Sequence, residues 1–167
     1  RGSAATRPSA VIHAISASAC RSSTGGFRAG SATRRARWPG KLVLKGILHP
    51  EDARQAVAAG ADGIVVSNHG ARSLDHSIAA IDALPAIVAA VNGQTAILLD
   101  SGVRRGSDVV KALSLGADAV MIGRATLYGL AAAGEAGVSR AIDLLGEETR
   151  RVMAMSGART IAEIDSG

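Results

Sequence analysis

Short apolar runs alternate with helical patterns along most of this chain, and this alternation predicts parallel α/β structure. The apolar runs span residues 42–46, 63–68, 96–102 and 119–124. They are rich in Val, Ile and Leu and lack apolar–polar alternation, as expected for strands buried on both faces. Helical patterns fill the intervals at residues 49–61, 77–91 and 107–117. Because parallel strands need helical crossovers, the pattern predicts repeated βα units.

The helix ends carry ordinary start and stop signals, and two of them share a repeated sequence. Pro50 stands in the first turn of one helix and Gly60 follows its last turn. Ser107 opens the third helix and Gly116 closes it. The segments "AAGADGIVV" and "SLGADAVMI" are near copies of each other. This echo supports a fold built from repeated βα units.

The fold class that fits best is α/β, as the last four βα units of a TIM (β/α)8 barrel, and a doubly wound sheet is the second choice. A complete barrel takes about 250 residues. Half a barrel would expose two strand edges and one inner face. We therefore expect either that the missing half comes from elsewhere or that the chain is truncated.

Two regions of different composition divide the chain at about residue 36. Residues 1–36 form a basic, low-complexity segment that predicts disorder or a linker, and residues 37–167 form the half-barrel with C-terminal helices. The formal net charge is +5, yet no acidic residue precedes Leu42, and from Leu42 onward 14 acidic residues outnumber 11 basic ones. A basic tail can bind nucleic acid, but these arginines are scattered and lack aromatic partners, so we expect no nucleic-acid partner.

The remaining composition narrows the class and the compartment. Cys20 is the single cysteine, which excludes an intrachain disulfide and a zinc cluster, and we expect no metal. No apolar stretch reaches the roughly 18 residues of a transmembrane helix. The segment "SAVIHAISASAC" makes a poor signal peptide. The expectation is a cytoplasmic protein, at most associated with the membrane periphery.

Charged and hydrogen-bonding residues stand at the carboxyl ends of all four predicted strands. In chain order they are Lys45, Ser67, His69, Arg72, Asp100, Ser101, Gly102, Val103, Arg104, Gly123 and Arg124. Each alone has a structural explanation, such as a snorkelling lysine, a core histidine or an Arg72–Asp75 surface pair. Because these strand ends share one rim of a parallel barrel, their coincidence predicts a functional site.

The last two strand ends favour phosphate. Gly102 and Gly106 flank a loop that can aim backbone N–H groups outward beside Arg104, and Gly123 with Arg124 repeats this arrangement. Loops after the last two strands are the usual phosphate site of such barrels. We therefore expect the phosphate of a cofactor here.

The first two strand ends favour chemistry on a small acid. His69 can act as a general base near neutral pH. Arg72 offers a planar fork for a carboxylate. Lys45 can stabilise negative charge on a bound ring. Together with the phosphate loops, these residues indicate oxidation of a small acid on a phosphate-bearing cofactor.

Four motifs resemble the FMN-dependent α-hydroxy-acid oxidases and dehydrogenases. They are "LVLKGIL", "GIVVSNHGARSLD", "DSGVRRGSDVVKALSLGADAVMIGR" and "GEAGV". That family includes glycolate oxidase, lactate oxidase, flavin-type lactate dehydrogenase and mandelate dehydrogenase. The resemblance runs from about Arg37 to about Ile164, and "DSG" with "GRATLYGLAA" is most similar to the mandelate dehydrogenase branch.

The resemblance implies FMN as cofactor, a small L-2-hydroxy acid as substrate and the 2-oxo acid as product. It places Lys45 beside the flavin N1 and C2 carbonyl and makes Ser67 a flavin contact. His69 would be the proton acceptor and Arg72 the carboxylate-binding arginine. The electron acceptor, whether oxygen, a quinone or a cytochrome, is left open, and the family implies a homo-oligomer.

The resemblance also assigns the phosphate side and exposes departures. Residues 100–104 correspond to the ribityl and phosphate loop, and Gly123 and Arg124 complete the phosphate site. Ser101 stands where the family usually has glycine. The family's first four strands are absent, and with them the carboxylate that orients the catalytic histidine. Tyr128 is not at a matching active-site position, and Asp75 is better explained as a turn or cap residue.

Three other hypotheses remain open from the sequence. The chain can be an inactive remnant of such an enzyme, a phosphate-binding barrel fragment of another reaction class such as an isomerase, or a nucleic-acid binder acting through the basic tail.

Overall fold

The computed structural model of the chain describes residues 13–16, 35–72 and 74–164. Most of residues 1–36, including Cys20, lies outside this range. The prediction that this segment is disordered concerns residues outside the described range. Within that segment the structure describes a short strand, His13–Ser16, which the sequence pattern did not predict.

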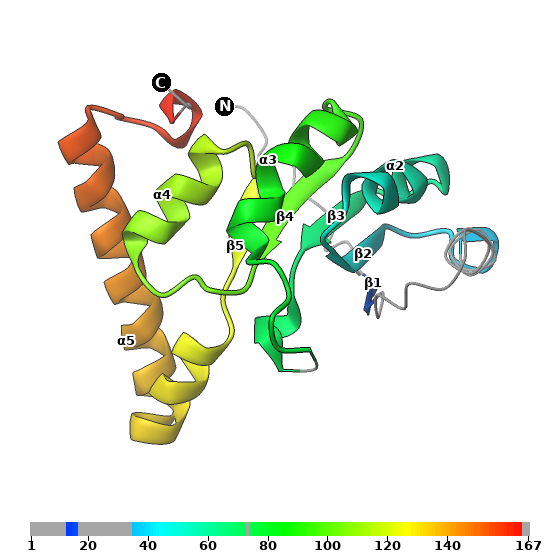
Figure 1. Ribbon diagram of the computed structural model, residues 1–167. Helices are drawn as coiled ribbons and strands as arrows, with labels where there is room; N and C mark the ends of the chain where they lie inside the picture. The colour runs from blue at the N-terminus through cyan, green and yellow to red at the C-terminus, as the bar shows by residue number, and fades with distance from the viewer. Residues whose placement is uncertain (1–12, 17–34, 73, 165–167) are drawn as a thin grey trace, which may run out of the picture.

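The described residues form a five-stranded parallel sheet with strand order β1-β2-β3-β4-β5 (Figure 1). Its strands are β1 (His13–Ser16), β2 (Leu42–Ile47), β3 (Gly63–Val66), β4 (Ala96–Asp100) and β5 (Ala119–Met121). The helices are α2 (Pro50–Ala58), α3 (Ala80–Val91), α4 (Gly106–Ser114) and α5 (Arg124–Ser156), with short 3₁₀ turns η1 (His69–Ala71) and η2 (Ile161–Glu163). The four strands and three crossover helices predicted from residue 42 onward are confirmed.

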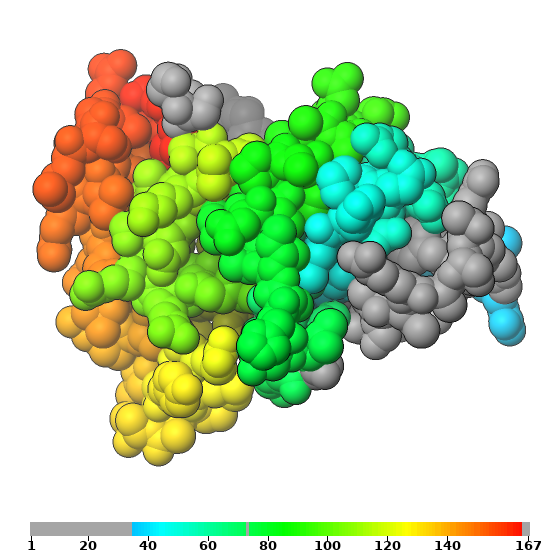
Figure 2. Space-filling view, viewed as in Figure 1, coloured from blue at the N-terminus to red at the C-terminus, as the bar shows by residue number. Residues whose placement is uncertain are grey.

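The winding of the chain is that of a barrel rather than of a doubly wound sheet. Each new strand is added on the same side of the previous one, so the strand order never reverses. Crossovers between parallel strands are right-handed, so a constant direction of winding places every helix on the same face. Helices α2, α3 and α4 pack against the strands of this face and form a continuous surface in Figure 2. The half-barrel expectation agrees with this arrangement.

The hydrophobic core lies between the sheet and this helical layer. In β2, Leu42 and Leu44 are buried, whereas Val43 and Lys45 on the opposite face are only half-buried. β4 repeats this alternation. Side chains of α3, including Leu84, Ile87 and Val91, are fully buried against the strands. The second face of the sheet, which corresponds to a barrel interior, therefore presents the polar residues of the strand ends.

Each copy of the Gly-Ala-Asp sequence ends a helix and accepts a hydrogen bond from the neighbouring strand. The glycine of each copy ends a helix with a positive φ, 79° in the first copy and 95° in the second. The Asp62 carboxylate then accepts a hydrogen bond of 2.9 Å from the Leu42 N–H, at the start of the neighbouring strand. Asp118 accepts one of 2.7 Å from the Ile97 N–H in the same way. Each copy thus fixes the register of two adjacent parallel strands.

Helix α5 consists of two parts that meet at a sharp break. Ala133 and Gly134 have non-helical backbone angles, and Figure 1 shows a short first part (yellow) followed by a long second part (orange). Glycines make the close approach possible, because a Cβ at Gly129 would lie 2.3 Å from the Gly137 carbonyl oxygen. The second part packs against α4, where the Glu148 carboxylate accepts from the Gly106 N–H at 2.9 Å. This packing fixes the loop that precedes α4.

Candidate functional site

A cavity of about 870 Å³ opens at the carboxyl ends of the strands, and it contains nearly every residue that the sequence singled out. Its lining includes Lys45, His69, Arg72, Asp100, Ser101, Gly102, Val103, Arg104, Gly123 and Arg124. Ser67 is the exception, because it is fully buried beneath the cavity floor. The volume falls within the range of about 300–1,000 Å³ that small-molecule sites occupy. The structure therefore brings the predicted site residues together, while their individual roles remain predictions.

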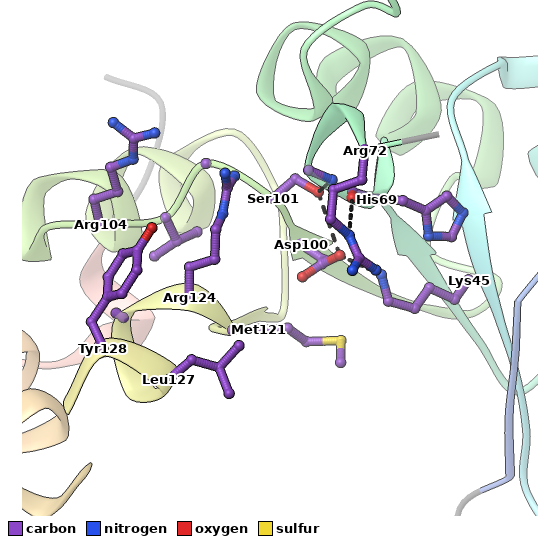
Figure 3. A pocket seen from close by; sticks show the side chains of 15 residues that line it. Lys45, His69, Arg72, Asp100, Ser101, Arg104, Met121, Arg124, Leu127 and Tyr128 are labelled. Carbon is purple, nitrogen blue, oxygen red and sulfur yellow. Dashed lines mark hydrogen bonds and ion pairs between the residues drawn. The ribbon is translucent and has the colours of Figure 1, made fainter. Parts of the chain in front are cut away.

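Cationic side chains lie on both sides of the cavity, and Asp100, the one carboxylate among the described residues that line it, lies between them. In Figure 3, Lys45 and His69 lie on the side of β2, whereas Arg104 and Arg124 lie at the opposite side, near Tyr128. Asp100, Ser101 and Arg72 lie between these two groups. A ligand that fills the cavity would thus meet different chemistry at its two ends.

A hydrogen-bonded cluster forms the floor of the cavity at the ends of β2, β3 and β4. Lys45 Nζ donates to Ser67 Oγ at 2.8 Å and forms an ion pair with Asp100. Ser67 Oγ donates to Asp100 Oδ2 at 2.5 Å. All three side chains are largely shielded from water, which strengthens the attraction between the opposite charges. The cluster ties three neighbouring strand ends together beneath the site.

Two opposing effects set the pKa of Asp100. Burial raises the pKa of this carboxyl, but the hydrogen bonds from Lys45 and Ser67 and the positive charge of Lys45 lower it. The net effect is a pKa below the ordinary value of 3.8. Asp100 is therefore ionised at neutral pH and balances the charge of Lys45.

The depressed pKa of Asp100 predicts a pH dependence of stability. A carboxyl with a lower pKa in the folded state adds stability that is complete above the ordinary pKa of 3.8 and is lost as the pH falls through the folded-state pKa. We expect Asp100→Asn to remove this part of the acid dependence and to cost about 1–3 kcal/mol at neutral pH, because Lys45 loses its counter-charge. Urea unfolding of both proteins between neutral and acidic pH tests this. Parallel stability curves with a constant offset would contradict it.

His69 stands at the start of a tight turn directly after β3. Its backbone N–H donates to Ser67 Oγ at 3.1 Å, which joins the turn to the cluster below. The imidazole lines the cavity, and within the described part of the chain it has no hydrogen-bond partner. The ring is therefore available to a ligand. The family resemblance implies a carboxylate that orients this histidine. No described residue places a carboxylate in hydrogen-bond contact with the ring.

Arg72 reaches across the turn instead of pairing with Asp75. Its Nε donates to the His69 carbonyl oxygen at 3.4 Å, and its guanidinium lines the cavity (Figure 3). Among the described residues, Asp75 makes no ion pair with it, and its Oδ1 accepts from the His76 N–H at 3.1 Å. The surface-pair explanation of Arg72 is thus not observed, and Asp75 acts as a turn residue. Among the described residues, the terminal nitrogens of Arg72 have no partner and can face a ligand.

The loops after β4 and β5 form an open cradle with two arginines. A Cβ added at Gly102 or Gly123 would meet no heavy atom within 4 Å, so both backbones face open space. The side chains of Arg104 and Arg124 have no hydrogen-bond or ion-pair partner among residues 35–72 and 74–164. Asp108 holds the first loop by accepting from the N–H groups of Arg104 and its neighbour, both at 2.9 Å. The cradle thus carries two uncompensated positive charges beside exposed backbone.

Five residues that line the cavity were missed by sequence reasoning: Gly70, Met121, Ala125, Leu127 and Tyr128. Leu127 and Tyr128 lie on the side near Arg124 (Figure 3), and Tyr128 is 70% exposed. The two α5 residues lie one turn beyond Arg124, so their helical spacing from that arginine was the available signal. They add apolar surface to the side of the cavity that carries Arg124.

Fold and site together define a class: a parallel α/β half-barrel whose strand ends gather a lysine, a histidine, three arginines and open glycine loops around one cavity. The model of the FMN-dependent dehydrogenase family matches residues 29–167. The chain belongs to this family. The recognition made from the four sequence motifs is therefore confirmed.

Relatives with established names support this assignment. An L-lactate dehydrogenase of Ectopseudomonas mendocina is 58% identical over 129 residues, which are 77% of this chain and 34% of the relative. An L-lactate dehydrogenase of Bartonella tribocorum is 60% identical over 127 residues, 76% of this chain and 33% of the relative. The chain thus spans about a third of the length of the curated relatives it matches.

Solved structures show the same partial correspondence. A mandelate oxidase with benzoyl-formic acid superposes with a TM-score of 0.78 at 49% identity, over 81% of this chain and 40% of the oxidase. A mandelate oxidase variant with a monooxide FMN adduct gives the same TM-score and identity, over 81% and 43% of the two chains. The α/β half-barrel prediction is confirmed by these neighbours. The leaning toward the mandelate dehydrogenase branch stays a prediction, because both lactate and mandelate enzymes are similar to this chain.

Two further properties concern membranes and metals. In the part of the chain that the structure describes, no helix combines the length and apolar character needed to cross a membrane. In the same part, no group of three His, Cys, Asp or Glu side chains is arranged to hold a metal ion.

Proposed function

We propose that this chain carries the catalytic rim of an FMN-dependent oxidoreductase that converts a small L-2-hydroxy acid to the 2-oxo acid. The observation that carries the proposal is the order of groups along one cavity: a lysine and a histidine at one end, an arginine fork in the middle, and two unpaired arginines with open glycine loops at the other. This order matches a ring, a substrate carboxylate and a phosphate.

The residues present fit FMN on three physical grounds. The glycine loops leave their backbone open where a phosphate would lie, and Arg104 and Arg124 supply charge that no described residue neutralises. Asp100 and Ser101 offer polar atoms midway along the cavity. Lys45 stands at the far end, where a positive charge can balance electrons on a bound ring.

Each of these residues then has a separate role in the reaction. Arg72 binds the substrate carboxylate through its free terminal nitrogens and fixes the α-carbon beside His69. His69 accepts one proton from the hydroxyl or the α-carbon as the C–H bond breaks. Bound FMN would supply the acceptor for the two electrons and the second hydrogen. Lys45, held by Asp100 and Ser67, offsets the negative charge that develops on the ring.

Anaerobic flavin reduction tests the proposal. We expect the purified protein with FMN to lose its visible flavin absorbance after addition of L-lactate or L-mandelate, with no change after the corresponding 2-oxo acid. Reduction by one of the two acids supports the oxidoreductase and identifies the better substrate. Bound flavin that no 2-hydroxy acid reduces would favour an inactive remnant or another phosphate-dependent reaction.

A substitution of Arg72 by lysine tests the carboxylate assignment. Lysine keeps the positive charge but loses the planar fork that binds both carboxylate oxygens. We expect KM for the hydroxy acid to rise about 10- to 100-fold, with a smaller change in kcat, because the contact is present in both the bound substrate and the transition state. Steady-state kinetics of Arg72→Lys measures this. Unchanged KM would exclude Arg72 as the carboxylate ligand.

A further inference from the structure

The turn that carries His69 has a backbone conformation that needs outside support. His69, Gly70 and Ala71 have φ values of 56°, 68° and 57°, so three successive residues are left-handed. This region is sterically unfavourable for residues with a Cβ, which applies to two of the three. Such a conformation persists only where the surrounding structure holds it in place. The contacts of the turn therefore determine where the histidine stands.

Hydroxyl groups at the ends of two strands hold the first two N–H groups of this turn. The His69 N–H donates to Ser67 Oγ at 3.1 Å, and the Gly70 N–H donates to Ser101 Oγ at 3.1 Å. The Gly70 N–H is shared with Asn68 Oδ1 at 3.0 Å. Ser67 and Asn68 directly precede the turn in sequence, whereas Ser101 comes from the end of β4. Ser101 is thus the contact that fixes the turn relative to the neighbouring strand.

The number of hydrogen bonds that each hydroxyl can make explains why Ser101 Oγ accepts from the Gly70 N–H. The Ser67 hydroxyl donates its proton to Asp100 and accepts two hydrogen bonds, from Lys45 and from the first N–H of the turn. A hydroxyl has one proton and two lone pairs, so Ser67 is saturated. Ser101 Oγ lies 3.3 Å from Ser67 Oγ and 3.4 Å from Asp100 Oδ2, and because Ser67 is saturated, the Ser101 hydroxyl donates to Asp100. Its lone pairs then remain for the Gly70 N–H.

The backbone at Ser101 favours glycine, which makes the presence of a hydroxyl informative. Ser101 has a φ of 85°, where a residue with a Cβ is strained and glycine is not. Serine therefore occupies this position in spite of its backbone.

From these contacts we infer that Ser101 is a positioning residue, whose hydroxyl fixes the His69 turn for catalysis. The inference rests on the proposed role of His69 as the proton acceptor. Ser101 acts through the Gly70 N–H and not by direct contact with the substrate.

Two substitutions separate the hydroxyl from the backbone strain. Ser101→Gly removes the hydroxyl and relieves the strained φ, whereas Ser101→Ala removes the hydroxyl and keeps the Cβ. Ser114→Ala is the matched control, because its hydroxyl donates to the Lys111 carbonyl on the exposed side of α4 and lies outside the cavity. If Ser101→Ala lowers stability too far, Ser101→Gly still tests the loss of the hydroxyl, because glycine suits the backbone at this position.

Hydrogen exchange of the Gly70 amide, measured by NMR on the full chain, is the direct readout. We expect about fivefold faster exchange at this amide in both Ser101 variants, with the remaining protection supplied by Asn68. Ser114→Ala should leave it unchanged. In protein that reduces flavin, both Ser101 variants should lower kcat, because the base is displaced from the substrate.

Equal exchange of the Gly70 amide in the parent and in both Ser101 variants would overturn the inference. A failure of flavin reduction in the parent protein would overturn the proposed function instead, and the exchange measurement distinguishes the two failures because it needs neither cofactor nor substrate.

Discussion

Replacement of His69 by glutamine is expected to lower the rate of anaerobic flavin reduction by about 10²–10⁴-fold. Glutamine can make hydrogen bonds of similar length but cannot accept the substrate proton at neutral pH. The imidazole lines the cavity and has no partner among the described residues, so its loss should not disturb the packing. Single-turnover reduction by L-lactate or L-mandelate, followed in a stopped-flow instrument, measures the effect.

A neighbouring histidine provides the control for this substitution. His76 lies in the same loop region, is exposed and does not line the cavity. Its φ of 59° is one that asparagine tolerates, so His76→Asn should retain the fold and the full rate. A His69→Gln protein that reduces flavin as fast as the parent would refute the assignment of the base.

Loss of both cradle arginines should weaken FMN binding more than any other pair of substitutions. A hydrogen bond to a charged group contributes about 1.5–3 kcal/mol, so Arg104→Ala with Arg124→Ala should lower the affinity about 10²–10⁴-fold. Both side chains lack partners among the described residues, so their removal leaves no buried charge behind. Fluorescence titration with FMN measures the change.

Arg105 is the matched control for the cradle. It directly follows Arg104, is largely exposed, and forms a 3.5 Å ion pair with Glu148 instead of lining the cavity. Arg105→Ala removes the same charge from the same loop, so a general electrostatic effect would appear in this variant as well. An FMN affinity lowered equally by Arg105→Ala would argue against a specific phosphate cradle.

Much of the fold was predictable because its signals are local. The apolar runs are uninterrupted, and each helix carries its own stop signal, so β2 to β5 follow from residues close in sequence. The Gly-Ala-Asp repeat was visible as a pattern, but its function was not. Only the structure shows that Asp62 and Asp118 accept from N–H groups near the start of neighbouring strands.

The residues of the site were predictable from the sequence, but the hydrogen bonds between them were not. Parallel strands end at one rim, so Lys45, His69 and Arg72 were expected near each other without knowledge of coordinates. The saturated Ser67 hydroxyl and the contact from Ser101 to the turn depend on register between strands, which no local pattern encodes. The four-residue strand β1 was missed for the same reason, because its only signal is pairing with β2.

Which side chains of α5 line the cavity beside Arg124 depends on the direction in which α5 leaves β5. Tyr128 lines the cavity because the helix begins directly after Gly123, whose φ of −132° and ψ of −78° set the direction of its first turn. Such a direction is a tertiary property. Sequence comparison assigned Tyr128 no active-site role, and the structure adds it to the lining without assigning it a catalytic one.

The central claim is that the strand ends of this chain bind a flavin through its phosphate and present it to a hydroxy acid. A paired titration of the purified chain with FMN and with riboflavin tests it most directly, because the two ligands differ only in the phosphate. We expect saturable binding of FMN, at least about tenfold weaker binding of riboflavin, and loss of this difference in the Arg104→Ala, Arg124→Ala protein. Equal affinity for the two ligands, or no binding of FMN by the folded chain, would contradict it.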